Sequence, residues 1–326
     1  MKAIIVEQFG GTEHLKLVDM ETPTPGPGQV LIRVKTTSVN FADIKARYGN
    51  KGAGKLPFIP GLEAAGVVEQ VGKRVSTVQV GQRVLAFPHN GSYAEYIIAD
   101  ANLTFSLPDE VTMEAAGASG IVTFLSYKLL ADLAKMEAGE TVVVHSAAGG
   151  VGTTAIQVAK ALSAGMVIGT VGTESKMPVA YDAGADHVLC YADGSWVEQV
   201  SALTGGTGSA IILDSVGGAV SEQSLACLAK YGRFVVFGNS SGTYAQLSTG
   251  ELHASCRSIL GYSLGTTRKE RPEQLQAAAP QVFQLLASGK VRIKINEKLP
   301  LESAAQAQEL VETRASTGKV LLVVEE

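Results

Sequence analysis

The pattern of apolar and polar positions changes near residue 111. Before it, short runs rich in β-branched residues alternate with Gly and Pro, a pattern typical of strands joined by turns. Val30–Val34, Ala65–Glu69 and Arg83–Phe87 are three of these predicted strands. After residue 111, apolar runs alternate with longer segments of helical period, which predicts parallel strands connected by helices.

The second half of this pattern predicts a doubly wound parallel sheet, the Rossmann arrangement. We expect this domain at 123–264, inserted in a β-rich domain made of 1–122 plus 265–326. The predicted strands of the insert are Val142–His145, Val167–Val171, Ala210–Asp214, Arg233–Phe237 and Ile259–Ser263, and its predicted helices include Thr153–Leu162, Lys176–Ala183 and Val220–Leu228. Helices Pro272–Ala287 and Ala304–Thr313 and strands Val291–Ile295 and Lys319–Val324 are expected to return to the first domain.

A glycine-rich turn follows the first strand of the insert. The segment Ser146–Gly152 (SAAGGVG) lies between the apolar run Thr141–His145 and the predicted helix. Small residues in such a turn let backbone N–H groups approach a pyrophosphate, and the helix N-terminus adds partial positive charge. The spacing is Ala147-x-Gly149-x-x-Gly152, with alanine in the place of the usual first glycine. We therefore predict dinucleotide binding; the alternative is a tight strand-to-helix turn without a nucleotide.

The end of the second strand bears on which dinucleotide is bound. NAD-binding folds place a carboxylate there to accept from the ribose 2′-OH. Here Gly172 and Thr173 follow Val171, and Lys176 lies one turn further on. This favours NADP(H) over NAD(H), although Glu174 could still reach a ribose.

The bulk composition excludes several classes of protein. The chain has 326 residues, 46% of them hydrophobic, and a formal net charge of −4, which gives no argument for nucleic-acid or anionic-membrane partners. Its three cysteines, Cys190, Cys227 and Cys256, are far apart, so they predict neither a disulfide framework nor a metal knuckle. The start, Met1–Val6, is expected to be a strand rather than a signal peptide, and no apolar run reaches the length of a membrane span. We expect a cytoplasmic protein.

Several segments occur in the order seen in one family. They are Asn40–Asp43 (NFAD), Gly61–Val68 (GLEAAGVV), Ala147–Gly152 (AAGGVG), Asp214–Gly217 (DSVG) and Phe237–Ser241 (FGNSS). Together the chain resembles the zinc-free quinone oxidoreductases, the zeta-crystallin-like branch of the medium-chain dehydrogenase/reductases. The resemblance implies a β-rich GroES-like catalytic domain, an inserted Rossmann domain with the active site in the cleft between the two, and a homodimer or homotetramer.

Zinc-dependent relatives hold a catalytic zinc with Cys, His and a third ligand. At the equivalent places this chain has Asn40–Asp43, which lacks the Cys, and Leu62, which has no donor atom. We predict no metal. Without a Lewis acid to stabilise an alkoxide, the expected acceptors are quinones or α,β-unsaturated carbonyls.

The resemblance assigns candidate catalytic residues. Asn40, Asp43 and Tyr48 fall where family members line the site beside the nicotinamide, and Tyr48 carries the hydroxyl that can donate to a developing oxyanion. The alternative for Tyr48 is an aromatic side chain packing a loop end. Thr123 matches the family threonine near the nicotinamide ring, the alternative being a hydroxyl bonded to its own helix backbone. Glu63 is expected to be structural rather than a base.

The resemblance also assigns cofactor-binding residues. Gly149, Gly150 and Val151 would contact the pyrophosphate, and Lys176 and Tyr191 the 2′-phosphate, unless Tyr191 is a surface tyrosine. The remaining candidates lie after strand ends or are weaker matches: Gly172, Thr173, Ser215, Phe237, Gly238, Asn239, Ser240, Leu264 and Arg314.

These observations lead to a ranked set of functions. The first is an NADPH-dependent, zinc-independent quinone reductase. The second is an enone, enal or enoyl-thioester reductase, which needs an acid such as Tyr48. The third is a non-catalytic NADPH-binding protein. We expect a homodimer formed through the edge strand at Ser258–Ser263, and we expect the basic run Arg268–Arg271 to be a solvated helix start.

Overall fold

The computed structural model describes residues 1–50, 55–89 and 91–324. The chain divides into two compact units, and each is described by itself. Unit 1 comprises Met1–Phe124, Gly265–Ala287 and Ile293–Glu326, and unit 2 comprises Leu125–Leu264 and Ser288–Arg292.

Unit 1 is built on a mainly antiparallel sheet in the order β13-β14-β3-β4-β5-β6, and an additional β3–β6 pairing closes four of the strands on themselves. Alternate residues of these strands, such as Val30, Ile32 and Val34 of β3, point into one apolar core because side chains alternate along a strand. The strands are β3 (Gln29–Ser38), β4 (Ala64–Val71), β5 (Arg83–Pro88), β6 (Tyr96–Ser106), β13 (Ile295–Pro300) and β14 (Lys319–Val323), with β1 (Lys2–Val6) and β2 (Leu15–Asp19) as a separate pair.

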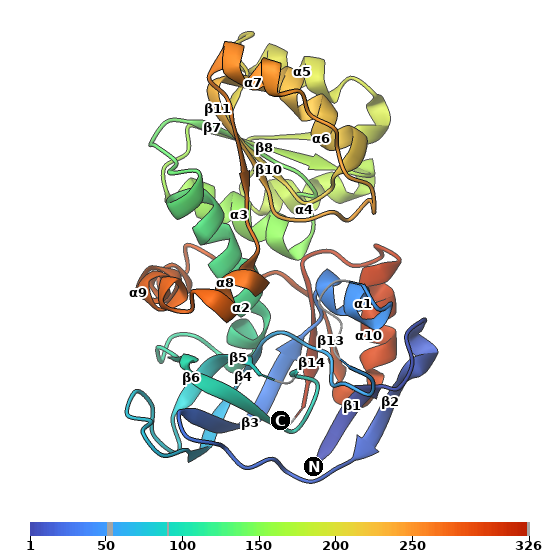
Figure 1. The fold of residues 1–326 in the computed structure, drawn as a ribbon. Helices are drawn as coiled ribbons and strands as arrows, with labels where there is room; N and C mark the ends of the chain where they lie inside the picture. Colours follow the sequence, from blue (N-terminus) through green and yellow to red (C-terminus); the bar gives the residue numbers. More distant parts are fainter. Residues whose placement is uncertain (51–54, 90, 325–326) are drawn as a thin grey trace. The chain divides into compact units, whose positions relative to one another are not determined.

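Helices complete unit 1 (Figure 1). The last of them, α10, packs on β14. Near α9, the rings of Phe87, Phe105, Phe124 and Phe283 form a buried cluster with centroids 5.2 to 6.3 Å apart. The helices are α1 (Phe41–Arg47), α9 (Glu273–Ala287) and α10 (Ala304–Glu312), with most of α2 (Met113–Tyr127) and of α8 (Leu264–Glu270).

The prediction of a strand at Val291–Ile295 is wrong, since the strand begins at Ile295. Near the start of the predicted strand, the backbone groups of Arg292 bond to a side chain instead of a strand, and ladder pairing with β14 starts only at Ile295. Gln157 Nε2 donates to the Arg292 carbonyl at 3.0 Å, and the Arg292 N–H donates to Gln157 Oε1 at 2.7 Å.

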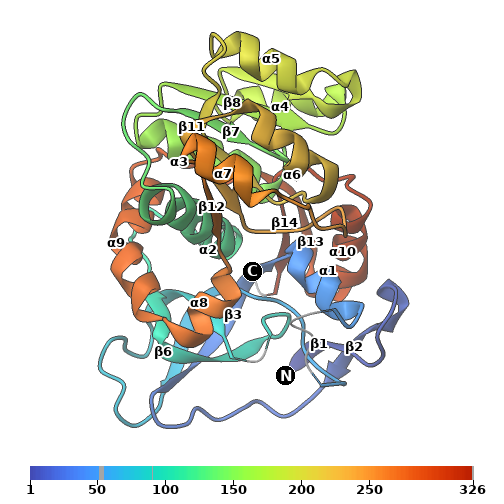
Figure 2. The ribbon, with the colours of Figure 1, turned by 45° about the horizontal axis from the view of Figure 1, so that its top comes forward.

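Unit 2 is the predicted doubly wound sheet, with six parallel strands in the order β12-β11-β10-β7-β8-β9. Helices α3 and α4 lie on one face, and α5, α6 and α7 on the other (Figures 1 and 2), as right-handed crossovers require. The strands are β7 (Thr141–Val144), β8 (Met166–Val171), β9 (His187–Cys190), β10 (Ser209–Asp214), β11 (Leu228–Val236) and β12 (Ser258–Gly261), and the helices are α3 (Gly150–Ala161), α4 (Met177–Asp182), α5 (Trp196–Leu203), α6 (Gly218–Ser224) and α7 (Thr249–Ser255).

The predicted helix Val220–Leu228 is too long, because β11 already begins at Leu228. The first part of β11 pairs with Ser209 and is separated from the rest of the strand by a register shift. Tyr231, in this part, has φ of +62°. Arg257 donates to the carbonyls of Leu228 and Ala229 and holds this irregular start. A bulged strand of this kind does not show the alternation by which strands are found in sequences.

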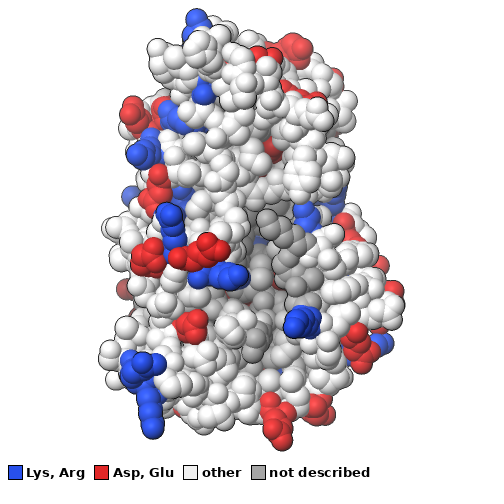
Figure 3. Space-filling model, viewed as in Figure 1, with Lys and Arg blue, Asp and Glu red and all other residues white. Residues whose placement is uncertain are grey.

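Among the residues that the structure describes, no helix combines the length and apolar composition needed to cross a bilayer. On the face shown in Figure 3, Lys and Arg side chains are interspersed with Asp and Glu on a largely uncharged surface.

Candidate functional site

The glycine-rich turn has the geometry of an anion-binding site. Helix α3 starts at Gly150 with Gly149 as its N-cap, so its first N–H groups lack intrahelical partners. A Cβ on Gly152 would lie 2.2 Å from the Ser146 carbonyl oxygen, so only glycine fits there. Ser146 itself is left-handed, with φ of +54°. The turn thus brings bare backbone close to the helix end, which suits a pyrophosphate.

A second group of predicted residues gathers where β10 and β11 end. The Phe237 N–H donates to the Asp214 carbonyl at 2.9 Å, and the Ser240 N–H donates to the Ser215 carbonyl at 2.8 Å. A Cβ on Gly238 would lie 3.0 Å from Ser215 Cβ. Ser215 and the segment from Phe237 to Ser240, which includes Asn239, therefore lie side by side at the carboxyl edge of the sheet, where ligands of such folds bind.

The third group follows β8 and β9. Val171 pairs with Cys190, so Gly172 and Tyr191 leave the sheet beside each other. Gly172 and Thr173 are exposed, and a Cβ on Gly172 would meet nothing within 4 Å. Lys176 ends a single 3₁₀ turn, Glu174–Lys176, so the rival carboxylate of Glu174 lies on the same turn.

Tyr191 is not a plain surface tyrosine, because it is half-buried and its hydroxyl is bonded within the protein. Its hydroxyl accepts from Thr170 Oγ1 at 2.7 Å and lies 3.0 Å from His145 Nδ1. His145 is buried, and its ring packs edge-on against Trp196. Sequence reasoning missed this cluster, although a histidine at the end of an apolar β-branched run was a visible signal.

In unit 1, a fully buried ion pair and its hydrogen bonds join four chain segments. Lys319 Nζ, at the start of β14, lies 3.1 Å from Glu63 Oε1 and 2.7 Å from Asn40 Oδ1. Asn40 Nδ2 and Ser38 Oγ also donate to Glu63 Oε1, at 2.9 and 2.7 Å. The Ile121 N–H donates to Glu63 Oε2 at 2.5 Å. With its oxygens satisfied in this way, Glu63 has the contacts of a structural residue.

Asp43 lies next to this pair, in the first turn of α1. Its Oδ2 accepts from the Asn40 N–H at 2.8 Å and from the Tyr93 hydroxyl at 3.2 Å. Burial raises the pKa of Asp43 to about 7, although the Asn40 N–H and the charge of Lys319 act in the opposite direction. The carboxyl group is therefore poised to hold or release a proton near neutral pH.

The structure does not bring Tyr48 into the network of Asn40 and Asp43. Tyr48 follows the last turn of α1, is 47% exposed, and donates to Glu312 Oε1 at 2.6 Å. This hydrogen bond to a carboxylate raises the pKa of Tyr48, because an ionised phenol would lose it. The Tyr48 proton is thus held in a hydrogen bond to the Glu312 carboxylate.

Thr123 is buried on α2, and its Oγ1 has no hydrogen-bond partner in the part of the chain that the structure describes. The alternative of a hydroxyl bonded to its own helix backbone is therefore wrong. Leu264 starts α8 and is buried, whereas Arg314 follows α10, is exposed and has φ of +59°. The cofactor roles of these residues stay predictions.

Arg268 is not part of a solvated helix start. Its Nη1 donates to the Leu62 carbonyl at 2.6 Å, and its guanidinium lies 5.3 Å from the centre of the Phe87 ring. Burial lowers the pKa of Arg268, and the nearby carboxylates of Glu63 and Asp43 oppose this. The short basic run in the sequence did not indicate these contacts of Arg268.

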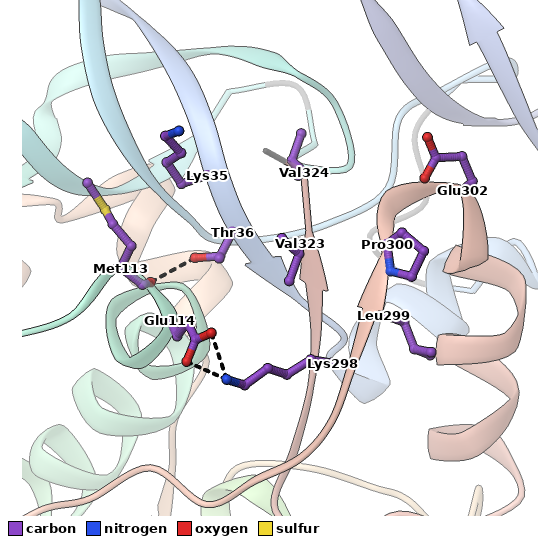
Figure 4. Close-up of a pocket in the computed structure, with 10 residues that line it drawn as sticks. All are labelled: Lys35, Thr36, Met113, Glu114, Lys298, Leu299, Pro300, Glu302, Val323 and Val324. Atoms are coloured by element: carbon purple, nitrogen blue, oxygen red, sulfur yellow. Dashed lines mark hydrogen bonds and ion pairs between the residues drawn. The ribbon is translucent and has the colours of Figure 1, made fainter. Parts of the chain in front are cut away.

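The described residues include no group of three or more His, Cys, Asp or Glu side chains able to hold a metal ion. A surface pocket of about 750 Å³ lies elsewhere in unit 1, where Lys298 pairs with Glu114 and Thr36 donates to the Met113 carbonyl (Figure 4). None of the residues predicted to bind cofactor or substrate lines it. Its lining is Lys35, Thr36, Met113, Glu114, Lys298, Leu299, Pro300, Glu302, Val323 and Val324.

Sequence and structure comparisons agree on one family. Residues 26–109 match the alcohol dehydrogenase GroES-like domain, and residues 150–282 match the zinc-binding dehydrogenase family. A quinone oxidoreductase of Salmonella typhimurium is 37% identical over 325 residues, covering 97% of both chains, and a human quinone oxidoreductase is 33% identical over 99% of this chain and 98% of its own. The crystal structure of Escherichia coli quinone oxidoreductase complexed with NADPH superposes with a TM-score of 0.92 at 34% identity, covering 99% of this chain and all of the other. The chain belongs to the quinone oxidoreductase family of the medium-chain dehydrogenase/reductase superfamily.

Proposed function

We propose that this chain is an NADPH-dependent, zinc-independent quinone oxidoreductase. The observation that carries the proposal is the turn between β7 and α3, where Gly152 leaves room only for backbone at the helix N-terminus. Its full-length similarity to quinone oxidoreductases, one of them solved with NADPH, supports the same assignment. When bound, NADPH supplies a hydride from its nicotinamide ring.

Three groups of residues would hold the cofactor. Gly149, Gly150 and Val151 would line the pyrophosphate, which would accept from the N–H groups of Gly150 and Val151, because the Gly149 N–H donates to the Ser146 carbonyl at 3.0 Å. Lys176 and Tyr191 would contact the 2′-phosphate, since they leave adjacent strand ends beside the open space at Gly172. Ser215 and the segment from Phe237 to Ser240 would line the remaining strand ends.

Zinc independence is supported by the chemistry of the side chains. Leu62 has no donor atom, and Asn40 binds Lys319 and Glu63 through its two amide atoms. Glu63, which follows Leu62 in the sequence, accepts from Ser38, Asn40, Lys319 and Ile121, which leaves it poorly suited to a metal ion. We therefore propose that substrate polarisation comes from protein groups alone.

A second function is favoured by Asp43. Reduction of an enone or enoyl thioester requires a proton on the α-carbon, and a carboxyl group with a pKa of about 7 is half protonated near neutral pH. Tyr48, the acid predicted from the sequence, instead donates a hydrogen bond to Glu312 Oε1. Asp43→Asn separates the two activities, because it should abolish enone turnover while the hydroquinone product can still take its protons from water.

The test of the main proposal is NADPH oxidation with 1,4-benzoquinone, with and without a metal chelator, combined with metal analysis of the purified protein. We expect turnover that the chelator leaves unchanged and a metal content far below one per chain. Turnover that the chelator abolishes and zinc restores contradicts zinc independence. Absence of NADPH oxidation with any quinone, but turnover of enones, makes the second function the main one.

We further propose a homodimer, supported by the sheet edge, and a cytoplasmic location, supported by the cysteines. Strand β12 is an edge strand of unit 2, and pairing with a second copy would make this chain a homodimer. Cys190, Cys227 and Cys256 are all unpaired, as expected for a protein of the reducing cytoplasm.

A further inference from the structure

A polar cluster, buried except for the half-buried Tyr191, lies in unit 2 where β7, β8 and β9 end. It consists of His145 after β7, Thr170 in β8, Tyr191 after β9 and Ser224 at the end of α6. The chain's single tryptophan, Trp196, packs edge-on against both His145 and Tyr191, with centroids 5.3 and 6.0 Å away.

Ser224 fixes the tautomer of His145. The Ser224 hydroxyl donates its proton to the Val220 carbonyl at 2.6 Å, so it accepts from His145 Nε2 at 2.9 Å. Burial lowers the pKa of His145 to about 4, against the opposing charge of Asp214, so the ring is neutral at physiological pH. Nε2 therefore carries the only ring proton, and Nδ1 is a bare acceptor.

Two hydroxyl groups compete for this acceptor. Thr170 Oγ1 lies 2.7 Å from Nδ1, and the Tyr191 hydroxyl lies 3.0 Å from it. Thr170 donates to Tyr191, and Tyr191 then donates to Nδ1. Because Nδ1 has one lone pair, the cluster holds one hydroxyl proton more than this nitrogen needs.

We infer that Thr170 and His145 are positioning residues that let Tyr191 donate a hydrogen bond to the 2′-phosphate of NADPH. When Tyr191 turns its proton to the phosphate, Thr170 can turn its own to Nδ1, so no buried acceptor is left unsatisfied. The inference rests on the proposed use of NADPH. The Tyr191 oxygen also has a hydrogen bond to the backbone of Ser146, at the start of the glycine-rich turn. Burial raises the pKa of Tyr191, which keeps the phenol protonated.

Thr170→Val tests this with little change in shape. Without the spare proton, Tyr191 must choose between Nδ1 and the phosphate, and one buried or charged acceptor loses a hydrogen bond. We expect the Kd for NADPH to rise about tenfold and the Kd for NADH to stay within about twofold, since NADH has no 2′-phosphate. In a Tyr191→Phe background, Thr170→Val should have no further effect on either cofactor.

The matched control is Thr141→Val, the same exchange at the opposite end of the neighbouring strand β7, which should change neither Kd. Emission from Trp196 monitors the integrity of the cluster in each variant. A rise in Kd of equal size for both cofactors, or an undiminished effect in the Tyr191→Phe background, overturns the inference while leaving NADPH dependence intact. If the unmodified protein binds NADH as tightly as NADPH, the proposed cofactor fails, and the inference with it.

Discussion

The hydroxyl of Tyr48 donates to Oε1 of Glu312 at 2.6 Å, which joins the end of α1 to the end of α10. The other oxygen of Glu312 accepts from the buried Arg47 at 2.5 Å, and the Arg47 guanidinium lies 4.7 Å from the centre of the Tyr48 ring. Tyr48 is thus part of a structural contact between two helices. A proton held in this way is poorly placed for transfer to a substrate.

Tyr48→Phe should therefore leave quinone reduction largely intact. We expect kcat with 1,4-benzoquinone to change by less than about twofold, and the free energy of unfolding to fall by about 1 kcal/mol through loss of one hydrogen bond. Steady-state kinetics and urea unfolding measure the two effects. A loss of kcat of a hundredfold or more would show that Tyr48 is the acid after all.

Asp43→Asn should change how stability depends on pH. The pKa of Asp43 is raised from 3.8 to about 7 in the folded protein, so the folded state binds this proton more tightly than the unfolded chain. This contribution to stability is complete below about pH 4 and is lost as the pH rises through 7. The asparagine variant does not ionise, so it should gain stability relative to the unmodified protein between these values, by at most about 1.4 kcal/mol per pH unit.

Urea unfolding of both proteins at several pH values between about 4 and 8 measures this gain. Asparagine keeps an oxygen for the Asn40 N–H and the Tyr93 hydroxyl, so the comparison isolates the charge. A stability difference that does not vary with pH would show that Asp43 titrates normally.

Lys319→Met should destabilise the protein strongly. It leaves the charge of Glu63, which is fully buried, without its cation. Removing one partner of a buried ion pair costs about 3–5 kcal/mol, whereas removing both costs less. We expect the double variant Lys319→Met with Glu63→Gln to regain part of the lost free energy of unfolding. A double variant less stable than the single one would contradict the assignment of a mutually dependent pair.

Gly152→Ala should weaken cofactor binding strongly in a protein that still folds. The added Cβ would lie 2.2 Å from the Ser146 carbonyl oxygen, so the turn must move away from the helix end. We expect the Kd for NADPH to rise by at least about a hundredfold, because the backbone N–H groups lose their alignment. Gly250→Ala in α7 is the matched control, since its Cβ would meet only Ser248 Oγ, at 3.6 Å. Equal affinity in both variants would contradict the role of the turn.

Light scattering at micromolar concentration tests the homodimer proposed for the β12 edge. The expected mass is twice the 33.9 kDa of one chain. A mass equal to that of one chain would contradict pairing through β12.

The sequence predicted what is encoded locally. The strand, glycine turn and helix around Ser146–Gly152 are contiguous, so their order alone indicated a nucleotide-binding turn. The Tyr48–Glu312 and Lys319–Glu63 contacts join residues 264 and 256 positions apart, and no local pattern specifies such pairs. The start of β11 was missed for another reason, because a bulge at Tyr231 interrupts the alternation that marks a strand.

The measurement that tests the central claim most directly is the ratio of kcat/KM for NADPH to that for NADH, with 9,10-phenanthrenequinone in metal-free buffer. The turn after β8 has no carboxylate directly at the strand end and has Lys176 on the same turn, so we predict a ratio well above ten, since one charge-assisted contact to the 2′-phosphate is worth about 1.5–3 kcal/mol. A ratio near or below one would contradict NADPH dependence and would assign the ribose contact to Glu174.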